Sequence, residues 1–221
     1  MGDILSPPGG QRTGGAGRSG KTRGPGQSRQ LGIRVVAGHA RGRRLVVPPG
    51  TDIRPTADRV REATFNSLAS LDRLRGASVL DLFAGSGALG IEALSRGAAQ
   101  ATFVDQAAPA VRTIRANLDA VGFADRATVR AADGWRHLAD ANVTYGLVLL
   151  DPPYAFDDWD ALLAAVAGRL EPAGLVVTES NRAVVSGRAG WEVLRTKAYG
   201  DTVVEIARLH LDIPHRSGAS A

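Results

Sequence analysis

The four residues Asp151-Pro152-Pro153-Tyr154 combine a carboxylate, two locked backbone positions and an aromatic ring in one short turn. Neither proline nitrogen can donate a hydrogen bond and both proline φ angles are fixed, so the turn is stiff. The Asp151 carboxylate and the Pro152 carbonyl are then two acceptors in fixed positions beside a flat ring. This arrangement suits a planar exocyclic amine such as that of a nucleobase. An ordinary turn after a strand uses the same residue types, so the tetrapeptide by itself leaves both interpretations open.

A second motif is the stretch Asp81-Leu-Phe-Ala-Gly-Ser-Gly-Ala-Leu-Gly90. Its glycines allow the backbone to approach a ligand and to turn directly into a helix. The motif also fits the dinucleotide fingerprint, because Asp105 lies twenty residues after Gly85, where an acid binds a ribose hydroxyl. Asp81, however, would repel a pyrophosphate and attract a cation. We therefore expect S-adenosylmethionine, whose sulfonium and α-amino groups are positive, in preference to NAD.

Four strand-like runs of the chain each end on an aspartate. They are residues 78–81, 101–105, 127–133 and 147–151. Helix-like segments follow them at residues 88–96, 107–121, 135–140 and 157–170. This alternation predicts an α/β fold with a doubly wound, mainly parallel sheet, whose ligands bind at the carboxyl ends of the strands. We therefore expect the four acids to meet at one edge of the sheet: Asp81, Asp105, Asp133 and Asp151.

The C-terminal part of the chain is expected to complete a seven-stranded sheet. Residues 170–179 are predicted to form a helix end, a turn and a fifth strand. Residues 191–195 and 202–209 are β-prone and flank Tyr199-Gly-Asp201, which is a signal for an antiparallel hairpin.

The basic residues are concentrated at the front of the chain. Residues 1–61 contain 12 Lys or Arg and 3 acids, whereas residues 62–221 contain 15 and 19. This distribution indicates that the front holds a polyanion. We expect a hairpin over residues 33–47 and then a helix capped by Thr56. The candidate phosphate contacts are Arg41, Arg43 and Arg44 at the hairpin tip, and Arg54, Thr56, Arg59 and Arg61 at the start of the helix. A solvated charged helix face is the alternative.

The composition narrows the class of protein. The 221 residues include no cysteine and no apolar run of membrane-spanning length, and the four histidines lack the spacing of metal ligands. The first residues lack the pattern of a secretory signal. We therefore expect a cytoplasmic protein without a metal. The expected organisation is a disordered tail (1–30), an RNA-binding hairpin and helix (31–75), a catalytic domain (76–213) and a flexible tail (214–221).

Residues 31–211 resemble the bacterial 16S (small-subunit) ribosomal RNA guanine-N2 methyltransferases of the RsmD type, which belong to the Rossmann-like class I methyltransferases. The glycine motif and the turn 151–154 are shared with many amino-directed methyltransferases, whereas Arg54-Pro-Thr-Ala-Asp-Arg-Val-Arg-Glu62 is much more specific to this family. Asp105 departs from the family, which usually has glutamate there. The segments that carry the resemblance are 34–38, 42–45, 54–62, 65–66, 81–90, 92–97, 151–154 and 199–202.

The resemblance implies S-adenosylmethionine as the cofactor and 16S rRNA, in the assembled 30S subunit, as the substrate. The sequence leaves the oligomeric state open, and a monomer is the default expectation. The implied contacts to the methionine part of the cofactor are Asp81, Phe83, Ala84, Gly85, Ser86 and Gly87. Asp105 would bind the ribose hydroxyls, and Asp133 would bind the adenine amino group with Trp135 nearby. Asp151 and Pro152 would accept hydrogen bonds from guanine N2, in a turn completed by Pro153, while Tyr154 stacks on the flipped base.

Three other functions stay open at this point. The same chemistry could act on adenine N6, cytosine N4 or a glutamine amide, although Asp at position 151 in place of Asn is mildly against the amide. An NAD-dependent oxidoreductase would leave Asp81 and the two prolines unexplained. A catalytically silent RNA-binding or ribosome-assembly protein would be expected to carry damage in the glycine motif or in the turn 151–154, and both are intact.

Overall fold

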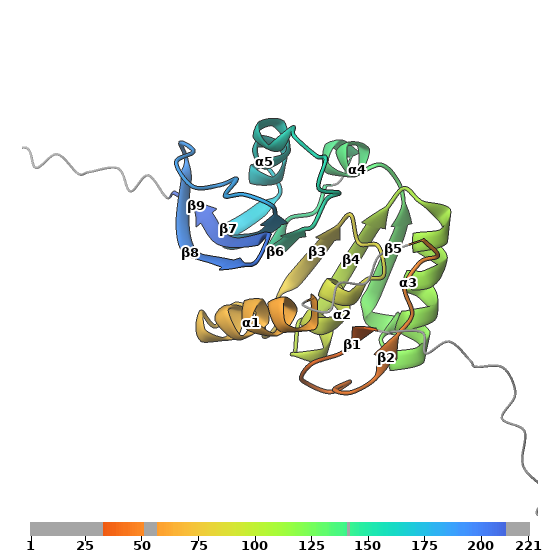
Figure 1. Ribbon diagram of the computed structural model, residues 1–221. Helices are drawn as coiled ribbons and strands as arrows, with labels where there is room; N and C mark the ends of the chain where they lie inside the picture. The colour runs from red at the N-terminus through yellow and green to blue at the C-terminus, as the bar shows by residue number, and fades with distance from the viewer. Residues whose placement is uncertain (1–32, 51–56, 141, 211–221) are drawn as a thin grey trace, which may run out of the picture. The chain divides into compact units, whose positions relative to one another are not determined.

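The computed structural model describes residues 33–50, 57–140 and 142–210 of the chain. The predicted tails over residues 1–30 and 214–221, and the candidate phosphate contacts Arg54 and Thr56, lie outside the described residues. The elements are β1 (Ile33–Arg34), β2 (Arg44–Leu45), α1 (Ala57–Ser70), β3 (Ser78–Leu82), α2 (Ala88–Ser95), β4 (Gln100–Asp105), α3 (Ala108–Val121), η1 (Ala124–Arg126), β5 (Ala127–Ala131), α4 (Gly134–Asp140), β6 (Tyr145–Leu150), α5 (Trp159–Ala167), β7 (Leu170–Ser180), β8 (Trp191–Tyr199) and β9 (Thr202–Leu209) (Figure 1).

The larger sheet has seven strands in the order β5-β4-β3-β6-β7-β9-β8 (Figure 1). The strands from β5 to β7 are parallel, whereas β9 is antiparallel to both β7 and β8. The sheet is the mainly parallel one that the sequence predicts, with its C-terminal antiparallel hairpin. The chain runs outward from β3 to β5 and then returns to place β6 on the other side of β3. Ligands of such sheets bind at this reversal, beyond the carboxyl ends of the strands.

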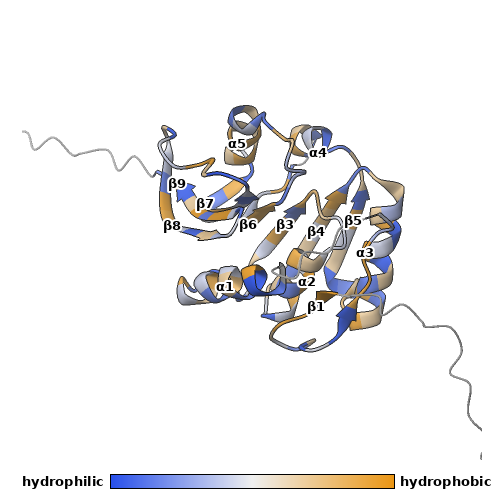
Figure 2. Ribbon diagram, in the orientation of Figure 1, coloured by the Kyte–Doolittle hydropathy of each residue, from blue (hydrophilic) through white to orange (hydrophobic). Residues whose placement is uncertain are grey.

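Helices cover both faces of the larger sheet, because buried parallel strands carry apolar side chains on both sides. In β6, Leu147 and Leu149 pack into a core with residues of α1, α2 and α3, and the intervening Val148 packs into a second core with residues of α4 and α5. Figure 2 shows hydrophobic stretches along the strands, whereas α1 and α3 present both hydrophobic and hydrophilic sides.

The N-terminal hairpin and helix share a core with the sheet. Val35, Leu45 and Phe65 are buried in the same cluster as Ile91 of α2 and Phe103 of β4. In the described part of the chain, residues 33–75 and the segment that follows them therefore belong to one compact unit.

Several element boundaries differ from the prediction, and two of the differences have a structural reason. The strands of the N-terminal hairpin have only two residues each, since the chain between them attaches to α2. The expected turn before the fifth strand is part of β7, where Leu170 pairs with Tyr145 and the next pair in the register is Leu175 with Leu147. The extra residues form an irregularity in which Ala173 has a φ of 62°.

Candidate active site

A cavity of about 740 Å³ lies at the carboxyl ends of the parallel strands. All four predicted aspartates line it: Asp81, Asp105, Asp133 and Asp151. The other predicted cofactor contacts that line it are Phe83, Ala84, Gly85, Ser86 and Trp135, and the whole turn 151–154 does so as well. The sequence prediction that separate strand ends meet at one site is therefore confirmed.

The alternation of side chains along the strands directs two of these acids to the same face of the sheet. Asp81 follows Val79 in β3, and Asp105 follows Phe103 in β4, each at a spacing of two residues. Both apolar residues belong to the core beneath α1, α2 and α3. Asp81 is inside its strand and only 1% exposed, because Leu82 continues β3 beyond it.

The glycine motif follows β3 and is attached to two of the acids. Oδ2 of Asp81 accepts a hydrogen bond of 2.8 Å from the Gly90 backbone nitrogen. A side chain at Gly90 has no room, since its Cβ would lie 2.4 Å from Cε1 of Phe103. Gly87, which we expected among the cofactor contacts, does not line the cavity and packs against Ile114 and Phe103 instead. Its role is therefore to begin α2 behind the loop.

Asp105 fixes the same loop from the neighbouring strand. Its Oδ2 accepts a hydrogen bond of 2.8 Å from the Gly85 nitrogen, and its Oδ1 accepts one of 2.8 Å from the Ala107 nitrogen. Each carboxylate oxygen has a second lone pair, so both can still accept a hydrogen bond from a hydroxyl group. The short side chain is thus held by backbone on both sides where it lines the cavity.

Flat aromatic side chains form one wall of the cavity. Phe156 lies 5.8 Å from Phe83 and 6.4 Å from Trp135 between ring centroids, and all three residues line the cavity. Oδ1 of Asp133 accepts a 2.9 Å hydrogen bond from the Trp135 nitrogen and so caps α4. Phe156 was missed by the sequence analysis, although an aromatic residue two positions after Tyr154 was a signal that could have drawn attention to it.

The buried carboxyl group of Asp81 is the main electrostatic feature of the cavity. Burial raises the pKa of Asp81 to about 7; the hydrogen bond from Gly90 opposes this shift and the charge of Asp105 adds to it. A buried carboxylate next to a second acid is favourable for a positively charged ligand. The buried acid, the acceptors at Asp105 and Asp133 and the aromatic wall fit S-adenosylmethionine, which presents cationic groups, ribose hydroxyls and an adenine ring.

The turn 151–154 borders the same cavity and is fixed at both ends. β6 ends at Leu150, and Asp151 follows it as an exposed residue, whereas Pro152 is buried. The Phe156 nitrogen donates a 2.8 Å hydrogen bond to the Pro153 carbonyl. The Tyr154 hydroxyl lies 3.1 Å from Oγ1 of Thr202, and the residue is 41% exposed. A ring that is held at its hydroxyl and open to solvent can still stack on a base.

Glu179 and Thr202 are two further residues of the cavity that the sequence analysis did not assign to the site. Thr178 pairs with Leu150 in the parallel register of β6 and β7, so Glu179 and Asp151 are the residues that directly follow this pair. Glu179 ends a strand-like run as the four aspartates do, and this was the available signal.

Several of the predicted phosphate contacts are on the surface. Arg41, Arg43, Arg44 and Arg59 are exposed, the first three at or next to the tip of the hairpin and the fourth in the first turn of α1. Exposed guanidinium groups in this position remain available to a polyanion.

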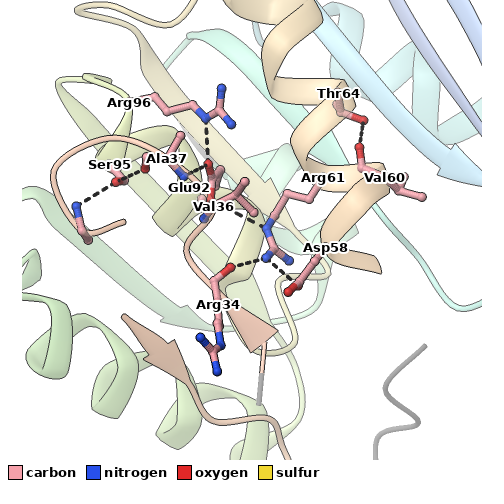
Figure 3. A network of polar contacts seen from close by, with 12 residues as sticks. Arg34, Val36, Ala37, Asp58, Val60, Arg61, Thr64, Glu92, Ser95 and Arg96 are labelled. Carbon is pink, nitrogen blue, oxygen red and sulfur yellow. Dashed lines mark hydrogen bonds and ion pairs between the residues drawn. The ribbon is translucent and has the colours of Figure 1, made fainter. Parts of the chain in front are cut away.

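Arg61, which we expected among the phosphate contacts, differs from this group: it is buried and bonded within the fold, at a position that also lines the cavity. It is 4% exposed, and its Nη2 donates to the Arg34 carbonyl and, over 2.9 Å, to Oδ1 of Asp58 (Figure 3). Its Nε also lies 3.8 Å from Oε2 of Glu92. Arg61 is on the side of α1 that packs against β1 and α2, so its charge serves the fold.

Glu92 attaches the segment after β1 to α2 (Figure 3). Its carboxylate is fully buried and accepts hydrogen bonds from the nitrogens of Val36 (2.7 Å) and Ala37 (3.0 Å) and from Nε of Arg96 (2.7 Å). Ser95 continues the attachment, since its Oγ accepts a 3.0 Å hydrogen bond from the Ala40 nitrogen. The hairpin is therefore fastened to the helix that begins at the glycine loop.

Asn117 of α3 provides a second link between the hairpin and the glycine loop. Its side chain accepts a hydrogen bond from the Val46 nitrogen and donates one to the Val46 carbonyl, both of 2.9 Å. The same amide donates a 2.8 Å hydrogen bond to the Ser86 carbonyl. The basic hairpin and the expected cofactor loop are thus joined through one buried side chain.

In the part of the chain that the structure describes, no three His, Cys, Asp or Glu side chains are arranged so that they could hold a metal ion. None of the helices described is long and apolar enough to span a membrane.

Comparisons with known proteins agree with this geometry. The family described as "Conserved hypothetical protein 95" matches residues 33–208. The Bacillus subtilis protein named "Putative rRNA methyltransferase YlbH" is 38% identical, over 79% of this chain and 97% of its own. The Escherichia coli protein named "Ribosomal RNA small subunit methyltransferase D" is 35% identical, over 79% and 88%. A solved structure described as "Putative methyltransferase yhhF from Escherichia coli" has a TM-score of 0.70 at 34% identity, over 81% of this chain and 98% of that one.

Proposed function

Because the chain belongs to the family described as conserved hypothetical protein 95 and its relatives include small-subunit rRNA methyltransferases, we propose that it is an S-adenosylmethionine-dependent rRNA methyltransferase. The acceptor in this proposal is the exocyclic N2 of a guanine in 16S rRNA. One observation carries it: the acid-lined glycine loop and the turn 151–154 border the same cavity. That arrangement places a cationic methyl donor next to acceptors suited to an exocyclic amine.

The inner part of the cavity is suited to the cofactor. When bound, S-adenosylmethionine supplies an electrophilic methyl group on a positively charged sulfur. The buried Asp81 carboxylate stabilises the positive groups of the ligand, and Asp105 accepts from its ribose hydroxyls. Asp133 accepts from the adenine amino group, and the wall that contains Phe83 and Phe156 lies beside the base.

The turn 151–154 is suited to the acceptor amine. The Asp151 carboxylate and the Pro152 carbonyl accept hydrogen bonds from guanine N2, which directs the lone pair of the nitrogen away from the turn. The Asp151 carboxylate would also stabilise the positive charge that develops on this nitrogen during transfer and take up the proton that the nitrogen then loses. Tyr154 stacks on the extruded base. The contributions of these residues are therefore positioning and electrostatic stabilisation, which need no covalent intermediate.

The exposed arginines of the hairpin and α1 contact RNA phosphates, which makes binding dependent on salt. We place the reaction on the assembled 30S subunit in the cytoplasm, with the enzyme acting as a monomer and without a metal. Adenine N6 and cytosine N4 would fit the same turn and are the nearest alternatives. An NAD-dependent oxidoreductase is disfavoured, since a buried acid below the glycine loop repels pyrophosphate.

The test is transfer of label from S-adenosylmethionine to small subunits that lack the modification, followed by digestion of the RNA to nucleosides. We expect N2-methylguanosine from the wild type and a rate lower by about 100- to 1000-fold from Asp151→Ala. Asp157→Ala is the matched control, because Asp157 is exposed, pairs with Arg182 and does not line the cavity. Label in another nucleoside would overturn the guanine assignment and keep the methyltransferase.

A further inference from the structure

Glu179 is an acid of the cavity that the proposed reaction does not yet use. It lines the cavity together with Asp151, Tyr154 and Thr202. The parallel register that pairs Leu150 with Thr178 makes Glu179 the neighbour of Asp151 across the two strands. The alternation along β7 places Glu179 on the face of Val177, which belongs to the core beneath α1, α2 and α3.

The position of Glu179 is fixed from both sides. β7 lies between β6 and β9, and Glu179 pairs with Val204 of the antiparallel neighbour. Side chains on a central strand are held more precisely than those on loops. A carboxylate in this position therefore has a defined location relative to the turn that binds the amine.

The three amino-bearing bases differ at the ring nitrogen next to the amine. In guanine N2 has a ring nitrogen on each side, the acceptor N3 and, on the Watson–Crick edge, N1–H, which is a hydrogen-bond donor. In adenine the neighbour of N6 is N1, and in cytosine the neighbour of N4 is N3; both nitrogens are acceptors. An ionised carboxylate has acceptor sites only. It can therefore bond the ring nitrogen of guanine, whereas it repels the lone pairs of the other two bases.

We propose that Glu179 selects guanine as the acceptor base by accepting a hydrogen bond from N1–H while Asp151 and Pro152 accept from N2. This inference rests on the proposed function and assigns a residue to its base specificity. It gives the cavity a physical reason to exclude adenine and cytosine, which the turn 151–154 alone does not provide.

The experiment compares two substrates and four proteins. The methylated guanine is first mapped in small subunits treated with the wild type, and subunits carrying adenine at that nucleotide are then prepared. Wild type, Glu179→Gln, Glu179→Ala and the control Glu171→Gln are assayed on both substrates. Glu171 is also on β7 but does not line the cavity, so its substitution removes a charge from the same strand without touching the base. Cofactor binding to each protein is measured by calorimetry.

We expect Glu179→Gln to lose about 10- to 100-fold of the rate on the guanine substrate. Its amide can donate to adenine N1, so N6-methyladenosine should form on the adenine substrate about tenfold faster than with the wild type. Glu179→Ala should lose the guanine rate without this gain, and Glu171→Gln should behave as the wild type.

Two outcomes would overturn the inference while the proposed function stands. The first is a Glu179→Gln protein with the wild-type preference for guanine. The second is a loss of activity accompanied by an equal loss of cofactor binding, which would assign Glu179 to the fold alone. Absence of N2-methylguanosine in the wild-type reaction is a different result, because it would overturn the proposed function itself.

Discussion

The hydroxyl group of Tyr154 lies 3.1 Å from Oγ1 of Thr202, which begins β9 forty-eight residues later in the chain. Thr202 is 4% exposed and therefore offers a fixed partner at the edge of the cavity. Tyr154 is part of an irregular turn, where an aromatic ring could otherwise rotate between several orientations. The contact thus holds the turn 151–154 against the C-terminal hairpin of β8 and β9.

We predict that Thr202→Val slows methyl transfer. Valine keeps the shape of threonine but removes the hydroxyl, and one hydrogen bond contributes about 0.5–1.5 kcal/mol, so the rate should fall about 2- to 12-fold. Single-turnover transfer to small subunits measures the effect. Thr196→Val is the control, because Thr196 is an exposed residue of the same hairpin. An unchanged Thr202→Val rate would show that the contact does not position the ring.

Cofactor affinity is predicted to rise with pH between about 6 and 8. The pKa of Asp81 is raised to about 7 by burial, so the empty site is partly protonated at neutral pH. A cationic ligand binds the ionised carboxylate of Asp81. Below pH 7 this group must first lose its proton, so the affinity for the cofactor falls as the pH falls. Calorimetric titration at several pH values checks this, and Asp81→Asn should bind weakly with little dependence on pH in this range.

The same carboxyl group should make the ligand-free protein less stable as pH rises. Its folded-state pKa of about 7 is above its unfolded value of 3.8. The contribution of Asp81 to stability is therefore fully present below pH 4 and is lost as pH rises towards 7. Urea unfolding of the wild type and Asp81→Asn at pH 5 and pH 7.5 isolates the contribution of this group. Between pH 5 and pH 7.5 the free energy of unfolding should fall more in the wild type than in the variant.

Gly38→Ala should destabilise the protein far more than Gly42→Ala. The two glycines have φ angles of 82° and 81°, so a side chain at either position causes the same backbone strain. A Cβ at Gly38 would lie 1.9 Å from the Ser95 carbonyl oxygen, whereas a Cβ at Gly42 would meet nothing within 4 Å. We expect Gly42→Ala to lower the free energy of unfolding by about 1–2 kcal/mol, from backbone strain alone. Gly38→Ala should cost more than about 4 kcal/mol, since backbone must move. Urea unfolding distinguishes them, and equal losses would contradict the close packing.

Glu92→Gln should destabilise the protein by about 3–5 kcal/mol, because it removes one partner from a buried group of charges. The carboxylate accepts from two backbone nitrogens and from Arg96, and the amide nitrogen of glutamine cannot accept. Glu62→Gln is the control on the exposed side of α1. Chemical denaturation measures both. A loss below about 1 kcal/mol would mean that the Glu92 charge is dispensable for the attachment of the hairpin.

RNA binding should depend on the exposed arginines and be independent of the charge of Arg61. Arg41→Gln and Arg43→Gln should each reduce the slope of log affinity against log salt by about 1. Arg112→Gln, on an exposed position of α3, is the control for a general effect of charge. Arg61→Gln should instead lower the free energy of unfolding. Binding of small subunits at several salt concentrations tests this, and a full unit of slope lost in Arg61→Gln would restore that residue to the interface.

The sequence alone determined the class of fold and the inner part of the site. Strand–helix alternation predicts a parallel sheet, and the two-residue period of a strand sends Asp81 and Asp105 to one face together with their apolar neighbours. Two consecutive prolines predict a stiff turn at Asp151 without knowledge of any other segment. These properties could be predicted because they arise from covalent geometry and from local periodicity.

The tertiary structure alone decided which further residues from distant segments join the four predicted aspartates in the cavity. Glu179 is next to Asp151 because β7 pairs with β6, and Thr202 reaches Tyr154 because β9 pairs with β7. Arg61 is buried because α1 packs its side of the helix against β1 and α2, although its neighbours in sequence include the exposed Arg59. Strand order and helix packing depend on how the faces of all the elements are buried together, and no local stretch of the sequence contains that information.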